Sequence, residues 1–86
     1  MDIQQSENEC SFFVIVDGIK AFLKYSVKDG LFDILTTQVP EKIGGRGIAS
    51  ALMKAALEYF NKQNLKPKKV LSCSYAQTYI ERHKNN

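Results

Sequence analysis

Alternating apolar and polar residues in the first half of the chain predict three β-strands. Residues 11–16 are β-branched and aromatic, and residues 19–27 alternate between apolar and polar positions. The Asp-Gly pair between these two runs is a strong hairpin signal. A second Asp-Gly turn leads into a third run over 31–39, which Pro40 ends because proline cannot donate to a sheet ladder. The pattern predicts an antiparallel meander.

The apolar period changes after residue 47. Apolar residues then recur at helical spacing and charged residues occupy the other side, which predicts a helix over 47–63. Residues 68–74 indicate a short buried strand, and residues 75–83 a closing helix for which Ser74 is a suitable N-cap. The predicted order is β-β-β-α-β-α. We therefore expect an α+β fold, with a mixed, mostly antiparallel sheet and one helix crossover.

Length and charge narrow the class of protein. The chain of 86 residues has room for one domain, so we expect residues 1–86 to form a single unit. A net charge of +3 favours an anionic ligand, but without a stripe of basic and aromatic residues it does not indicate nucleic acid. No apolar run approaches the roughly 18 residues of a membrane span, and the polar, acidic start is unlike a signal peptide. Two cysteines, Cys10 and Cys73, are expected to be free thiols in the cytoplasm.

Three of the five glycines, Gly44, Gly45 and Gly47, fall within four positions at the mouth of the predicted helix. The start of a helix presents unpaired N–H groups and the positive end of the dipole, which together bind phosphate when no side chain blocks the approach. A purely structural turn explains such glycines equally well.

Two common phosphate-binding motifs fit poorly. A P-loop requires Lys and then Ser or Thr after its last glycine, where this chain has Ile48 and Ala49. A dinucleotide fingerprint requires Gly or Ala at position 50, which is Ser50, and an acidic residue after the next strand, where this chain has Ser-Cys-Ser at 72–74.

The stretch GGRGIASALM after TTQVP resembles the acetyl-CoA signature of the GNAT N-acetyltransferase superfamily, Gln/Arg-x-x-Gly-x-Gly/Ala. Gly47 and Ala49 match its last two positions, whereas Gly44 stands where the family has Gln or Arg. The element order also resembles the GNAT core from its second strand onward. The closing segment is similar to the C-x-Y…Y…H segment of compact GNAT-like proteins, matched here by Cys73, Tyr75, Tyr79 and His83.

The resemblance implies that the chain binds acetyl-CoA. Backbone amides of 45–50 would hold the pyrophosphate, and the backbone of 37–39 would pair with the pantetheine arm. Arg46 and the lysines at 66, 68 and 69 are candidates for the 3′-phosphate. The residues expected to bind the cofactor are Thr37, Val39, Gly44, Gly45, Arg46, Gly47, Ile48, Ala49, Ser50 and Tyr75. No metal site is expected, because the spacing of Cys and His fits none.

Acetyl transfer to an amine requires a polarised carbonyl and an acid for the departing thiolate. Tyr79 resembles the tyrosine that protonates the coenzyme thiolate in many GNAT enzymes. Cys73, close to a helix start, is a candidate nucleophile or base, and equally a small buried apolar residue. His83, one turn beyond Tyr79, is a candidate base or acceptor-binding group, or a solvated helix-end residue. Asp33 and Glu41 are the acidic candidates for a general base, and Asp33 is better placed to face a cleft.

The sequence therefore predicts an acyl-CoA-dependent N-acetyltransferase that moves an acetyl group to an unidentified amine. A CoA-binding or protein-interaction module with weak or no catalysis is the alternative. The chain lacks the two helices that wall the acceptor site in full-length GNAT enzymes, so we expect an open acceptor side. We expect no nucleic-acid or membrane partner, and a monomer or weak dimer.

Overall fold

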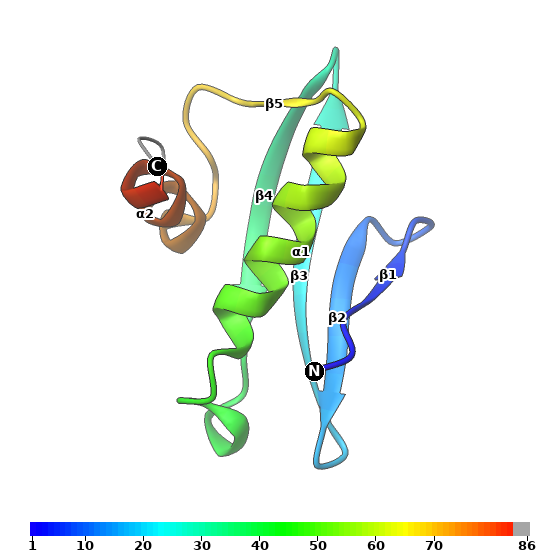
Figure 1. Cartoon of the computed structure of the whole chain (residues 1–86), viewed down its shortest axis with the longest axis vertical. Coiled ribbons are helices and arrows are strands. Elements are labelled where there is room, and N and C mark those ends of the chain that lie inside the picture. The colour runs from blue at the N-terminus through cyan, green and yellow to red at the C-terminus, as the bar shows by residue number, and fades with distance from the viewer. Residues whose placement is uncertain (84–86) are drawn as a thin grey trace.

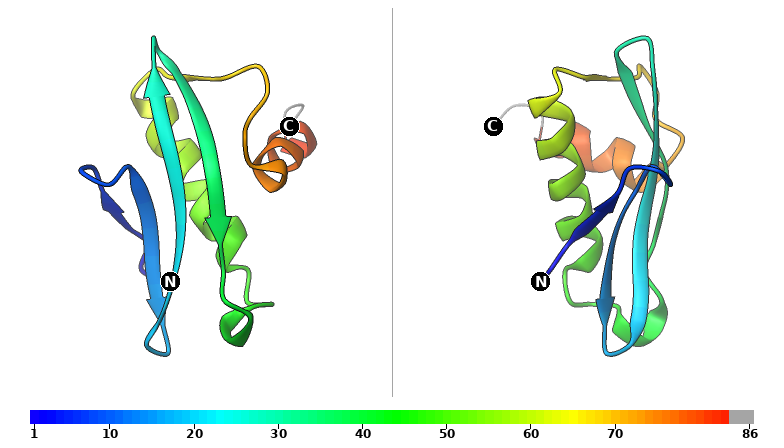
Figure 2. Two further views of the ribbon diagram at one scale, coloured as in Figure 1. Left: turned by 180° about the vertical axis from the view of Figure 1, so that it is seen from behind. Right: turned by 90° about the vertical axis from the view of Figure 1, so that its right-hand side faces the viewer.

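Five strands form one sheet that carries both α-helices on a single face (Figures 1 and 2). The computed structural model describes residues 1–83. The strands, in their order across the sheet, are β1 (Gln4–Ser6), β2 (Ser11–Val16), β3 (Ile19–Lys28), β4 (Leu31–Gln38) and β5 (Lys66–Pro67). The helices are α1 (Ile48–Lys62) and α2 (Ser74–His83), and a 3₁₀ turn, η1 (Glu41–Ile43), precedes α1.

The predicted α+β class and the helix crossover are confirmed. Strands β1 to β4 pair antiparallel, and β5 pairs parallel to β4 after the α1 crossover. Both Asp-Gly turns have positive φ at both residues, which the tight type I′ hairpin requires: 54° and 74° at Asp17 and Gly18, and 56° and 78° at Asp29 and Gly30. No helix of the described part precedes β4.

The core lies between the sheet and α1. Leu52, Ala56 and Phe60 follow one another at the i, i+4 spacing on α1, and each is at most 1% exposed. The Phe60 ring stacks on Phe32 of β4 with centroids 4.1 Å apart and meets Tyr25 of β3 edge-on at 5.1 Å. This packing fixes α1 antiparallel to β4, so α1 begins beside the carboxyl end of that strand (Figure 1).

Strand β1 was not predicted. Its residues are polar and its burial shows no alternation, because it lies at the edge of the sheet with only β2 beside it. The Gln5 amide donates a hydrogen bond to the Tyr25 hydroxyl at 3.1 Å, which links this edge strand to β3.

The prediction of a buried strand over 68–74 is wrong. Only Lys66–Pro67 form a strand, and Val70 is 67% exposed. The Lys68 N–H donates to the Phe32 carbonyl at 2.8 Å, and the next bond to β4 runs from the Cys73 N–H to the Ile34 carbonyl at 2.9 Å. Five residues thus advance along this segment while two advance along β4, so the intervening residues leave the ladder.

The predicted N-cap is also shifted by one residue. Ser74 is the first residue of α2, and the Gln77 N–H bonds to the Cys73 carbonyl at 3.0 Å, which makes Cys73 the cap residue. Cys73 therefore lies at the junction of the connection and the helix.

The other face of the sheet has no helix over it in the described part of the chain (Figure 2). Lys20, Phe22 and Lys24 alternate onto this face from β3, and the Lys20 ammonium lies 4.9 Å from the centre of the Phe13 ring. This short stripe of basic and aromatic residues corrects our expectation from the sequence that none is present. Neither helix of residues 1–83 has the length and apolar character needed to cross a membrane.

Candidate functional site

The glycine loop, residues 44–47, joins η1 to α1 and is exposed throughout. Gly45 and Gly47 have φ of 76° and 74°, in the left-handed region, and a Cβ on either would meet no atom within 4 Å. Their backbone conformation, and not crowding, therefore favours glycine. Gly44 has an ordinary φ of −69°, but a Cβ there would lie 3.3 Å from the Glu41 carbonyl oxygen. The tight 3₁₀ turn thus favours glycine at the position where the signature has Gln or Arg.

Helix α1 begins without a side-chain cap. Its N-cap residue is Gly47, and no acidic residue lies in its first turn. Helix geometry leaves the N–H groups of residues 48–50 without partners inside the helix. Ile48 is 2% exposed and contributes only its backbone, whereas the Ser50 side chain is exposed. The helix start thus places backbone donors at the positive end of the dipole, directly after the exposed glycine loop.

Arg46 forms an ion pair in the structure. Its guanidinium donates to the Asp17 carboxylate at 2.9 Å, which ties the glycine loop to the β2–β3 turn. The two side chains are 49% and 66% exposed, so water screens the pair and its contribution to stability is small. Arg46 is therefore able to exchange Asp17 for a ligand phosphate at little cost.

Strand β4 has a free edge next to the glycine loop. Strand β5 pairs only with Leu31 and Phe32, so residues 35–38 have no strand on that side in the described structure. The ladder with β3 also shifts here, because Lys24 pairs with Thr36 and Tyr25 with Ile34, which leaves one extra residue of β4 as a bulge. The backbone groups along this edge are available to an extended ligand.

The structure brings Cys73 to this edge. The Cys73 side chain is half-buried, and its Sγ lies 3.8 Å from the Thr37 hydroxyl oxygen. Two residues from distant parts of the sequence, one expected to act in catalysis and one to bind the cofactor, therefore meet between β4 and α2. Val39 follows them, half-buried, just past the end of β4.

Tyr75 lies in the first turn of α2 and is 40% exposed. Burial raises the pKa of the Tyr75 hydroxyl, nearby Tyr79 and Cys73 raise it further, and a hydrogen bond with Ser50 lowers it in part. Tyr75 is thus a neutral hydroxyl near neutral pH, adjacent to the exposed start of α1.

Tyr75, Tyr79 and His83 form a row along one side of α2. The ring centroids of Tyr75 and Tyr79 are 6.1 Å apart, and Tyr79 stacks on His83 at 4.1 Å. The His83 Nδ1 donates to the Tyr79 carbonyl oxygen at 2.7 Å, which assigns the ring proton to that nitrogen.

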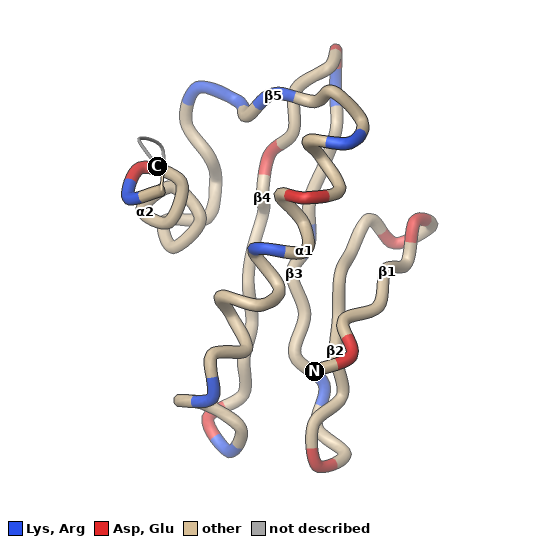
Figure 3. Tube along the Cα trace, viewed as in Figure 1, with Lys and Arg blue, Asp and Glu red and all other residues tan. Residues whose placement is uncertain are grey.

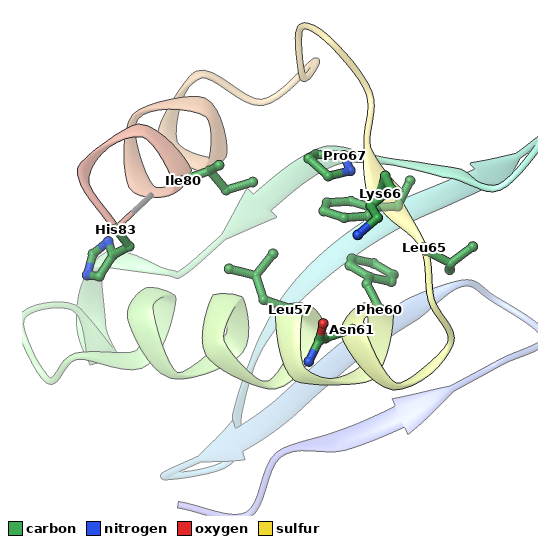
Figure 4. A pocket seen from close by; sticks show the side chains of 9 residues that line it. Leu57, Phe60, Asn61, Leu65, Lys66, Pro67, Ile80 and His83 are labelled. Carbon is green, nitrogen blue, oxygen red and sulfur yellow. The ribbon is translucent and has the colours of Figure 1, made fainter. Parts of the chain in front are cut away.

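The structure does not bring His83 to Cys73. His83 lies at the opposite end of α2, where it lines a hollow of about 270 Å³ with residues of the carboxyl half of α1 (Figure 4). Leu57, Phe60 and Asn61 supply the α1 side of this hollow, and Ile80 joins His83 on the α2 side. The hollow is separate from the glycine loop.

The acidic and basic candidates lie in different parts of the structure. Asp33 is 6% exposed and bonds to the connection before α2, while Glu41 is exposed on η1. Lys66, Lys68 and Lys69 follow α1 at the end of the sheet opposite to the glycine loop (Figure 3). The structure therefore does not bring these three lysines to the start of α1. The contact between Asp33 and Ser72 was missed because its partners are far apart in sequence.

Comparison with known proteins identifies the family of the chain. The model of the GCN5-related N-acetyl-transferase family matches residues 11–86. The chain is 33% identical over 84 residues to Protein NATD1 of Gallus gallus, covering 94% of this chain and 74% of that protein. It is 34% identical over 82 residues to Protein NATD1 of Mus musculus and 39% identical over 82 residues to that of Xenopus tropicalis, covering 92% of this chain and 73% of each relative. The chain belongs to the GCN5-related N-acetyltransferase family.

Proposed function

We propose that this chain binds acetyl-CoA and transfers its acetyl group to an amine. The observation that carries the proposal is the placement of two unsatisfied sets of backbone groups side by side. The uncapped start of α1 and the free edge of β4 meet at the glycine loop, within the stretch that resembles the family signature. The first suits a pyrophosphate and the second an extended amide chain.

The residues divide this task by their chemistry. The N–H groups of residues 45–50 would hold the pyrophosphate, with Ser50 adding a hydroxyl and Arg46 a cation released from Asp17. Residues 37–39 would bond the pantetheine amides. The acyl group would then lie where Cys73 and Thr37 meet. Lys66, Lys68 and Lys69 have no part in this proposal, because they lie at the other end of the sheet.

Acetyl-CoA supplies an activated thioester, and the protein supplies a proton and orientation. In direct transfer, the neutral amine attacks the carbonyl carbon, the C–S bond breaks, and the coenzyme thiolate takes a proton from Tyr79. The nitrogen then loses one proton through water, which restores the Tyr79 hydroxyl. In the second route, the Cys73 sulfur attacks the carbonyl carbon and coenzyme A leaves with the proton of the Cys73 thiol. The amine then attacks the acetyl-cysteine, and the proton lost by its nitrogen restores the thiol. His83 would act on neither route directly, since it lies at the far end of α2, and would support Tyr79 by stacking. Unpaired Cys10 and Cys73 suit a reducing compartment such as the cytoplasm.

A CoA-binding or interaction module without efficient transfer is the second candidate. Gly44 lacks the side chain of the signature, and the described residues place no helix over the open face of the sheet. Both candidates bind acetyl-CoA, and they differ in turnover.

The test combines binding and turnover. Acetyl-CoA binding is measured by calorimetry, and coenzyme release is followed with a panel of amines. We expect Cys73→Ala and Tyr79→Phe each to reduce turnover while leaving binding near that of the parent, with Cys10→Ala as the matched control. Mass spectrometry for acetyl-Cys73 separates the two routes. Binding without turnover on any amine would favour the module, and absence of binding would refute both candidates.

A further inference from the structure

Asp33 is the one charged side chain buried in the described part of the chain, at 6% exposure. It lies on β4 between two core residues, Phe32 and Ile34, and by strand alternation it faces away from α1. A buried carboxylate is costly unless hydrogen bonds replace its water. Its partners therefore indicate what it does.

Both carboxylate oxygens of Asp33 bind the connection between β5 and α2. One accepts the Ser72 backbone N–H at 2.8 Å, and the other accepts the Ser72 hydroxyl at 2.6 Å. The Lys68 ammonium lies 3.8 Å from the same second oxygen, with 58% of its side chain exposed. Because both oxygens are occupied, Asp33 is poorly suited to act as the general base we considered from the sequence.

The backbone neighbours of Asp33 hold the two ends of the same connection. The Phe32 carbonyl accepts the N–H of Lys68, and the Ile34 carbonyl accepts the N–H of Cys73. Between these bonds the connection has more residues than the ladder can pair. The backbone of β4 bonds only to the two ends of the connection, at Lys68 and Cys73. The Asp33 side chain holds the part between them, through Ser72.

We propose that Asp33 is a positioning residue for Cys73. Ser72 precedes Cys73 directly, so fixing Ser72 sets the Cys73 thiol against Thr37 and sets the first turn of α2. The role in transfer rests on the proposed function. The position of the thiol is measurable without acetyl-CoA, so the two claims fail separately.

The experiment measures alkylation of Cys73 by iodoacetamide, followed by mass spectrometry, in a Cys10→Ser background. Ser72→Ala is the main variant, because it removes a hydroxyl from Asp33 and leaves every charge in place. Loss of a hydrogen bond to a charged group corresponds to about tenfold or more in the local equilibrium, so we expect alkylation to accelerate by about tenfold. Asp33→Asn is expected to act in the same direction, and the double variant to exceed the larger single effect only slightly.

Two controls separate positioning from general stability and from charge. Ile34→Val destabilises the core without touching the carboxylate, and Lys68→Ala changes the local charge without touching Ser72. Both are expected to leave the alkylation rate of the native protein unchanged. Equal rates for Ser72→Ala and the parent, or equal acceleration by Ile34→Val, would overturn the proposal.

The link to transfer is tested in the same variants. If the parent is active, Ser72→Ala is expected to lower kcat with little change in the KM for acetyl-CoA, because the amides of residues 45–50 are untouched. A parent that binds no acetyl-CoA refutes the proposed function and leaves the alkylation result standing. An unchanged kcat would limit Asp33 to a structural role and overturn the link.

Discussion

The segments that lead into the two helices of this protein differ. Helix α1 starts at a glycine with no side-chain cap, after a loop whose residues 44–47 are exposed. Before α2, by contrast, three successive backbone N–H groups all have acceptors. Leu71 donates to the Gln77 side chain at 2.9 Å, Ser72 to Asp33 at 2.8 Å, and Cys73 to the Ile34 carbonyl at 2.9 Å.

The difference separates two kinds of helix start. Donors left unpaired in an exposed loop are available to an anion, and this is the state of α1. The paired donors of residues 71–73 instead hold the segment before α2 against β4, and Cys73 accordingly lies beside the free edge of that strand. We infer that the start of α1 binds a ligand, and that the segment before α2 positions side chains.

The largest expected effect is at the start of α1. Gly47→Glu places a carboxylate against the pyrophosphate, so we expect acetyl-CoA affinity to fall by about a hundredfold or more. Gly30→Glu is the matched control, because its φ of 78° is close to the 74° of Gly47 and open space surrounds both. Calorimetry on the two variants is decisive, and equal affinities would show that the glycine loop only shapes a turn.

The next effect concerns the start of α2. Asp33→Ala removes the carboxylate that accepts two hydrogen bonds from Ser72. We therefore expect the free energy of unfolding to fall by about 2 kcal/mol in urea denaturation. Glu58→Ala, which removes an exposed carboxylate from α1, is expected to change it by less than about 0.5 kcal/mol. Similar values for both variants would remove the basis for a fixed α2 start.

A smaller effect is expected from freeing Arg46. Asp17→Asn breaks an exposed ion pair, so acetyl-CoA affinity is expected to rise about twofold, within the range of roughly 0–1 kcal/mol for such pairs. Asp29→Asn is the matched control, since Asp29 occupies the same position of the other hairpin, with φ of 56° against 54°. A decrease in affinity for Asp17→Asn would mean that the ion pair holds the loop ready for binding.

The smallest effect is a pH dependence at Tyr75. Burial raises its pKa above the ordinary value of 10.0, so the folded state retains a proton that the unfolded state has lost. Stability is therefore complete below pH 10 and decreases as the pH rises through the raised pKa. Tyr75→Phe is expected to reduce this alkaline loss in part. Tyr25→Phe is expected to reduce a further part, because burial also raises the pKa of Tyr25. An unchanged dependence of stability on alkaline pH in both Tyr75→Phe and Tyr25→Phe would contradict the burial of these two hydroxyls.

Local signals were sufficient to predict much of the fold. The Asp-Gly turns specify their hairpins through backbone conformation at two adjacent residues. The apolar period of α1 likewise reports a helix with one buried side. The glycine loop was visible as a candidate ligand site because it depends on neighbouring residues alone.

Long-range contacts explain what the sequence concealed. The run KKVLSCS has strand-like composition, yet the Asp33 carboxylate bonds to Ser72, 39 residues away, and that segment leaves the ladder. Strand β1 carries no alternation because edge residues face water on both sides. The same connection brings Cys73 to Thr37. No local sequence pattern predicts this contact.

The most direct test of the account is an amide NMR titration of the isotope-labelled protein with acetyl-CoA. The account predicts large shifts at residues 44–50, smaller ones at Thr37, Cys73 and Tyr75, and none at Lys66 on the far end of the sheet. No shifts at millimolar acetyl-CoA, or shifts centred on Lys66 and its neighbours, would contradict the claim that the uncapped start of α1 binds the cofactor.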